Sequence, residues 1–94
     1  MDILLDEIRC SIAEMSGEFT THELILTLAQ MYQREYITAL YEHRDAARPF
    51  QIVHSKIGKC LRNHPELVEF VPGGRTDVDI FGQKSENAGW RKHQ

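Results

Sequence analysis

The sequence predicts one α+β domain that is mainly helical, with three to four helices followed by a C-terminal antiparallel β-hairpin of two to three strands. Apolar residues recur at helical intervals in residues 2–15, 22–44 and 49–63, whereas after Pro65 they alternate with polar residues at the period of a strand. The 94 residues are enough for one core and too few for two. We therefore expect a single domain over residues 1–94.

The first expected helix covers residues 2–15 and ends at Ser16-Gly17, because glycine commonly follows a helix C-terminus. Its apolar stripe consists of Leu5, Ile8, Ile12 and Met15. Residues 18–20 are long enough for one rung of a strand. Thr21 is expected to cap the next helix, since its hydroxyl can accept a hydrogen bond from a free backbone amide.

Residues 22–44 keep a helical pattern in which apolar residues recur every fourth position. These residues are Leu24, Leu28, Tyr32, Tyr36 and Leu40. A break at residues 33–35 is an option, but no glycine or proline enforces it. The pattern leaves open whether this stretch forms one long helix or two shorter ones.

The helix expected over residues 49–63 starts at Pro49, which suits a first helical position, and ends before Pro65. One side is apolar and consists of Phe50, Val53, Ile57, Cys60 and Leu61. The opposite side is polar and consists of Gln51, Ser55, Lys59 and Arg62. Glycine inside a helix costs about 1 kcal/mol relative to alanine, so Gly58 indicates close approach of the helix to another body. That body is either DNA or the first helix.

The last third of the chain reads as strands and turns. Residues 67–71 alternate as a strand, Pro72-Gly73-Gly74 is expected to end it, and residues 77–81 form a short extended piece. Residues 82–87 are polar and turn-rich. Residues 88–92 are expected to return as a strand beside 67–71, with Trp90 on the core face.

This order of elements resembles the winged helix-turn-helix superfamily. The residues that carry the resemblance are Thr21, Pro49-Phe50, residues 57–61 and residues 90–92. It implies binding of double-stranded DNA, with helix 49–63 in the major groove and the wing, residues 72–87, on the DNA backbone. A transcriptional regulator or a DNA-associated accessory factor is then expected. The stretch 22–48 is longer than the superfamily pattern, so an extra helix or a long connection must occupy it.

The charge distribution points in the same direction although the net charge is −3. Residues 1–45 carry nine acids and three bases, whereas residues 46–94 carry five acids and eight bases. No acid occurs in residues 46–65. A local basic footprint is typical of a polyanion partner. The residues expected to contact DNA are Arg48, Gln51, Ser55, Lys56, Lys59, Arg62, Arg75, Lys84, Arg91 and Lys92.

Two further interactions are consistent with the sequence. The acidic N-terminal half suits a basic protein partner, which makes a protein-interaction module the alternative function. DNA half-sites favour two-fold dimers, and either the first helix or the tyrosine-rich face of 22–44 would supply a homodimer interface.

Other classes of site find little support. No run of apolar residues is long enough to span a membrane, and the acidic start differs from a secretory signal, so we expect no membrane partner and a cytoplasmic, nuclear or nucleoid location. Cys60 and His64 are spaced as half of a metal site, but Cys60 lies on the apolar side of its helix and is better explained as a core residue. The carboxylates Asp77 and Asp79 come with no metal motif. We expect no metal, no cofactor and no enzymatic activity.

Overall fold

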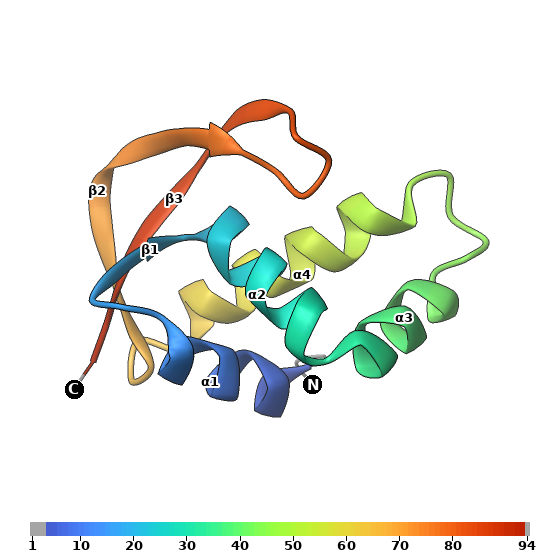
Figure 1. The fold of residues 1–94 in the computed structure, drawn as a ribbon, viewed down its shortest axis with the longest axis horizontal. Helices are drawn as coiled ribbons and strands as arrows, with labels where there is room; N and C mark the ends of the chain where they lie inside the picture. The colour runs from blue at the N-terminus through green and yellow to red at the C-terminus, as the bar shows by residue number, and fades with distance from the viewer. Residues whose placement is uncertain (1–3, 94) are drawn as a thin grey trace.

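The computed structural model describes residues 4–93, and Figure 1 shows its arrangement. Within this range four helices surround one core: α1 (Leu5–Glu14), α2 (Thr21–Met31), α3 (Gln33–Glu42) and α4 (Pro49–Asn63). Strands β1 (Glu18–Thr20), β2 (Val68–Val78) and β3 (Lys84–Lys92) form an antiparallel sheet in the order β1-β3-β2. The predicted class, α+β and mainly helical with strands at the C-terminus, is confirmed.

The core lies where the apolar stripes of the helices meet the inner face of the sheet. Its buried side chains are Ile8, Ile12, Phe19, Leu24, Ile25, Leu28, Tyr36, Ala39, Val53, Ile57, Cys60, Leu61, Val68 and Trp90. The stripes predicted for α1 and α4 therefore contribute as expected, although Asp2 lies outside the described residues. Phe50 is an exception, because its side chain is exposed at the start of α4.

Residues 22–44, left open as one helix or two, form two helices that meet at Tyr32. The backbone of Tyr32 leaves helical geometry, with φ −125° and ψ 57°. Its amide still donates to the Leu28 carbonyl (2.8 Å), and its carbonyl accepts from the Tyr36 amide (2.9 Å). The change of direction lets α3 place Tyr36 against α4.

The N-terminal cap of α2 is Thr20, so the prediction of Thr21 is wrong by one position. The Thr20 hydroxyl accepts from the Glu23 amide (3.1 Å), and the Glu23 carboxylate accepts from the Thr20 amide (2.8 Å). This reciprocal pair satisfies two free amides of the helix terminus. The Thr21 hydroxyl instead accepts from the buried Trp90 indole N–H (2.9 Å) and tethers α2 to β3.

The hairpin is longer than predicted. Strand β2 continues through residues 72–74, where three residues stand opposite Ala88 alone and the register shifts. Gly73 and Gly74 take positive φ values of 105° and 62°, which only glycine adopts easily. A bulge of this kind bends and twists a strand instead of ending it. The expected strand end at Pro72-Gly73-Gly74 is therefore wrong.

The turn of the hairpin is confined to residues 79–83, so Lys84–Asn87, expected in a turn, belong to β3. Asp79 organises this turn by accepting the amides of Phe81 (2.9 Å) and Gln83 (3.0 Å). Figure 1 shows the hairpin arching over α2, and the Phe81 ring contacts the Phe50 ring at the start of α4. None of the helices in residues 4–93 has the length and apolar content that a membrane crossing requires.

Candidate nucleic-acid interface

Helix α4 turns its apolar side into the core and its polar side to solvent. Gln51, Ser55, Lys59 and Arg62 are all exposed, as predicted from the helical wheel. Arg48, just before the helix, and Lys56, on its flank, are exposed as well. No acidic group within residues 4–93 lies within ion-pairing distance of these four bases. Their charges are available to a partner.

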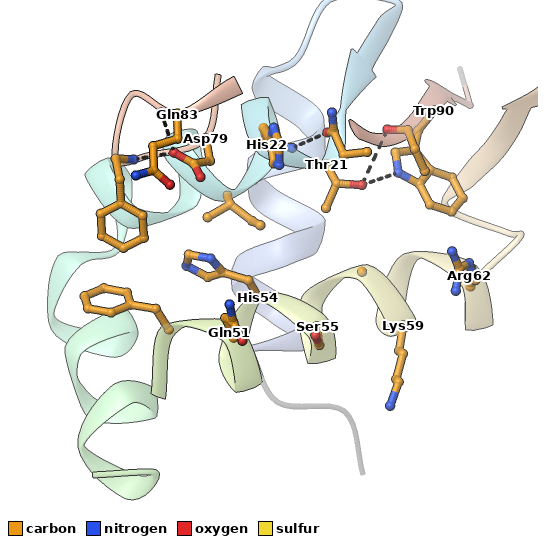
Figure 2. A pocket seen from close by; sticks show the side chains of 16 residues that line it. Thr21, His22, Gln51, His54, Ser55, Lys59, Arg62, Asp79, Gln83 and Trp90 are labelled. Carbon is orange, nitrogen blue, oxygen red and sulfur yellow. Dashed lines mark hydrogen bonds between the residues drawn. The ribbon is translucent and has the colours of Figure 1, made fainter. Parts of the chain in front are cut away.

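The polar side of α4 forms one wall of an open groove of about 550 Å³. The N-terminus of α2 and the hairpin form the other walls, as Figure 2 shows. Lys59 extends away from the helix into solvent, and Arg62 lies at the end of the groove beside Trp90. A second shallow hollow on the other flank of α4 is lined by Arg48, Lys56 and their neighbours. Both flanks of the helix are therefore accessible.

Gly58 lines the groove beneath α2. A Cβ atom built on it would meet the Thr21 methyl group at 4.0 Å, an ordinary contact distance. The body nearest to Gly58 is therefore α2 and not the first helix, and this packing does not demand glycine.

Aromatic side chains close the groove at the N-terminal end of α4. The rings of Phe50 and Phe81 meet edge to face, with centroids 5.0 Å apart, and Phe50 also contacts His54. The Tyr36 hydroxyl lies 2.6 Å from His54 Nε2. Burial raises the pKa of Tyr36 to about 12, and burial together with the charge of His22 lowers the pKa of His54. Both shifts favour the neutral forms of the two side chains that share this hydrogen bond.

Three of the basic residues predicted to contact DNA have partners within the protein. Arg91 pairs with Glu18 (2.9 Å) and Glu69 (2.8 Å) across the three strands, and Arg75 also reaches Glu18 (3.2 Å). The hydrogen bond and charge of Arg91 hold the pKa of Glu18 below its usual value. The Lys92 ammonium donates to the backbone carbonyls of Ala13 (3.1 Å) and Met15 (2.9 Å).

Arg91 also lies on a different face of the protein from the cations of α4. Arg91 is next to Trp90 in β3, and successive side chains of a strand point to opposite faces. Because Trp90 faces the core and the groove, Arg91 belongs to the outer face of the sheet. The expected surface shared by helix and hairpin cations therefore includes neither Arg91 nor the internally bonded Arg75 and Lys92.

Lys84 is exposed at the start of β3 and lies outside the groove lining. The acids of the hairpin outnumber its bases. Residues 72–87 contain the bases Arg75 and Lys84 and the acids Asp77, Asp79 and Glu86. The predicted wing is thus slightly acidic, and the cationic surface is essentially that of α4.

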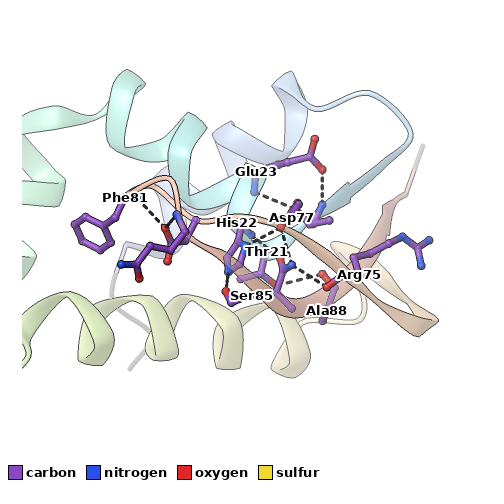
Figure 3. Close-up of polar contacts among 12 residues, drawn as sticks. Thr21, His22, Glu23, Arg75, Asp77, Phe81, Ser85 and Ala88 are labelled. Atoms are coloured by element: carbon purple, nitrogen blue, oxygen red, sulfur yellow. Dashed lines mark hydrogen bonds and ion pairs between the residues drawn. The ribbon is translucent and has the colours of Figure 1, made fainter.

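A polar network that sequence reasoning missed joins the hairpin to α2 (Figure 3). Asp77 accepts hydrogen bonds from Thr20 Oγ1 (2.7 Å), His22 Nδ1 (2.7 Å) and Asn87 Nδ2 (2.9 Å). Burial alone would raise the pKa of Asp77, but these three donors outweigh it and lower the pKa. Asn87 also accepts from the His22 amide (2.8 Å). The network fixes how the hairpin lies against the helices.

In the part of the chain that the structure describes, no three histidine, cysteine or acidic side chains are grouped so as to hold a metal ion. Cys60, considered as half of a metal site, is buried in the core. Comparison of the chain with protein families, with curated proteins and with solved structures found no match.

Proposed function

We propose that this protein binds double-stranded DNA through the exposed face of α4, as its resemblance to winged helix-turn-helix proteins implies. The observation that carries the proposal is the row of cations on this helix that have no acidic partner within residues 4–93, together with the lack of acids in residues 46–65. Solvated cations on one helix face are the electrostatic footprint of a DNA-binding element. An α-helix has the diameter that the major groove admits.

The residue types along this face suit both kinds of DNA contact. Arginine and lysine can donate to guanine, and glutamine can pair with adenine, so Arg62, Lys59 and Gln51 are the candidates for base contacts. Arg48 and Lys56 flank that row and suit phosphate contacts, which fix the position of a protein on DNA without reading sequence. Ser55 lies between Gln51 and Lys59 and can donate to either kind of group.

The hairpin has a different role in this proposal from the one that the sequence predicts. Because residues 72–87 carry a net charge of −1, they offer little attraction to the DNA backbone. The Phe50–Phe81 contact and the Asp77 network instead hold the hairpin against α2 and α4. In this arrangement the hairpin supports α4, and the duplex approaches the helix from its open side.

Binding of a fluorescent duplex, followed by anisotropy at low salt, tests the proposal. The double variant Lys59→Ala/Arg62→Ala should lose affinity at least about tenfold, because each good base contact is worth about 1–3 kcal/mol. The matched control is Arg9→Ala/Arg34→Ala, which removes the same charge from exposed positions of α1 and α3. No binding by the wild type, or an equal loss in the control, would contradict the proposal.

A second candidate function is protein binding through the acidic N-terminal half, and one observation favours it. Ile37 and Tyr41 lie one turn apart on α3, and both side chains are 62% exposed. Glu35 and Glu42 border them on the same helix, which suits a partner with an apolar centre and a basic rim. The variant Ile37→Glu should then abolish capture of that partner after nuclease treatment and leave duplex binding unchanged. Capture that depends on intact nucleic acid would exclude this candidate.

A further inference from the structure

Ser85, His22 and Asp77 lie in line where the hairpin meets α2, as Figure 3 shows. Ser85 Oγ is 3.3 Å from His22 Nε2, and His22 Nδ1 is 2.7 Å from Asp77 Oδ1. The three residues come from β3, the first turn of α2 and β2, and Asp77 and Ser85 are direct neighbours across the two strands. A hydroxyl, an imidazole and a carboxylate in this order form the constellation of an activated serine nucleophile.

The network around Asp77 determines how the imidazole is oriented. A carboxylate only accepts hydrogen bonds, so the Nδ1 atom of His22 must carry the hydrogen that it donates to Asp77. In the neutral ring this leaves the lone pair of Nε2 directed at Ser85. The bond from the His22 amide to Asn87 holds the backbone from which the ring extends. The ring is therefore held in the tautomer that a general base for Ser85 requires.

The serine is accessible, and the network does not need it. Ser85 is exposed, whereas the His22 side chain is only 14% exposed. Asp77 is already satisfied by Thr20, His22 and Asn87. The contact of Ser85 with His22 is thus an addition at the surface, where a reagent can reach the hydroxyl.

We propose that Ser85 is a nucleophile activated by His22 and accepts acyl groups from small carboxylic esters, with Asp77 as the residue that positions His22. Ser85 Oγ would form a bond to the ester carbonyl carbon, its proton would pass to His22 Nε2, and the bond from that carbon to the alcohol oxygen would break as the alcohol takes the proton. Water would then attack the acyl-serine and pass one proton to Nε2. The bond to Ser85 Oγ would break, a carboxylic acid would leave, and the proton would return to Ser85.

A fluorophosphonate probe tests the nucleophile directly, because an activated serine displaces its fluoride and forms a stable bond to phosphorus. Mass spectrometry of digested protein locates and times the adduct. Ser16, an exposed serine after α1, serves as the reference in the same molecule. Ser85 should react at least about 100-fold faster than Ser16, the low end of what a positioned general base contributes.

Variants then separate activation from mere exposure. Ser85→Ala should remove the adduct. It should also lose the hydrolysis of p-nitrophenyl acetate that the matched control Ser16→Ala retains. His22→Gln should lower the reactivity of Ser85 to that of Ser16. Equal labelling of the two serines in the wild type, which requires no variant to fold, would overturn the proposal.

The role of Asp77 has its own readout. Nitrogen NMR of the His22 ring distinguishes the two neutral tautomers, and the wild type should show hydrogen on Nδ1. In Asp77→Asn the amide can donate to Nδ1, so the hydrogen should move to Nε2 and the labelling of Ser85 should fall. An unchanged tautomer with unchanged labelling would show that Asp77 does not position His22.

Discussion

At the scale of single residues, Asp77 joins four elements. From its place in β2 it bonds to β1 through Thr20, to α2 through His22 and to β3 through Asn87. Replacing it with asparagine turns one accepting oxygen into a donor that faces other donors. We expect Asp77→Asn to lower the free energy of unfolding at pH 7 by about 1–3 kcal/mol, the usual cost of leaving such groups unsatisfied.

The effect of Asp77 should depend on pH in a defined direction. The hydrogen bonds from Thr20, His22 and Asn87 outweigh burial and place the pKa of Asp77 in the folded state below its unfolded value. Its ionised form therefore stabilises the fold above the unfolded pKa, and this contribution is lost as the pH falls through the folded pKa. The stability difference between the wild type and Asp77→Asn should shrink from about pH 5 toward pH 2 in urea titrations followed by Trp90 fluorescence. A difference that stays constant, or that shrinks equally for exposed Asp6→Asn, would contradict this assignment.

Contacts between residues close in sequence were easier to predict than contacts between residues that only folding brings together. The capping pair Thr20 and Glu23 has the spacing of a capping box, so the correct cap could have been read from the chain. The contact of His22 with Asp77 spans 55 residues and could not be predicted from the sequence, because it depends on strand register. The side of α4 that faces solvent was predictable, since helical periodicity alone determines it.

At the scale of elements, Gly58 is where the stability of α4 and its proposed function diverge. A methyl group fits beneath Thr21, so Gly58→Ala should raise the free energy of unfolding by up to about 1 kcal/mol through helix propensity. The matched control Gly74→Ala should do the opposite, because Gly74 has a φ of +62°. Urea unfolding of both variants measures the two signs. If α4 lies close against DNA at Gly58, the Gly58→Ala variant should bind the duplex more weakly although it is more stable. A lower free energy of unfolding in Gly58→Ala would contradict the packing beneath Thr21.

The strands show why element boundaries were harder to predict than helix faces. Pro72-Gly73-Gly74 has the composition of a turn, and the two glycines do adopt turn-like φ angles. Pairing with β3 nevertheless resumes at Arg75, because the partner strand continues alongside. Local composition reports the bend but not the cross-strand bonds that carry the strand past it.

At the scale of the whole molecule, the sequence locates the positive charge but not which cations are already paired. Eight of the residues predicted to contact DNA are bases, yet Arg75, Arg91 and Lys92 are bonded within the protein. Arg75 also donates to the carbonyl of neighbouring Gly74, but the other partners of these three residues lie at least 22 positions away in the chain, on segments that only the fold brings near. Of the other five bases, Lys84 belongs to the slightly acidic hairpin, and Arg48, Lys56, Lys59 and Arg62 lie on α4 or just before it.

The number of cations that are not bonded within the protein determines the salt dependence of DNA binding. Each phosphate neutralised contributes about −0.9 to the slope of log K against log salt concentration, so four contacts give a slope of about −4 at most and eight would give about −7. We expect a slope no steeper than −4 for the wild type, reduced by about 2 in Lys59→Ala/Arg62→Ala, from anisotropy titrations over a salt series. Arg91→Ala should leave the slope unchanged, because its guanidinium is held between Glu18 and Glu69 on the outer face of the sheet. A slope near −7 that Arg91→Ala reduces would mean that the sheet and not α4 forms the main contact with DNA.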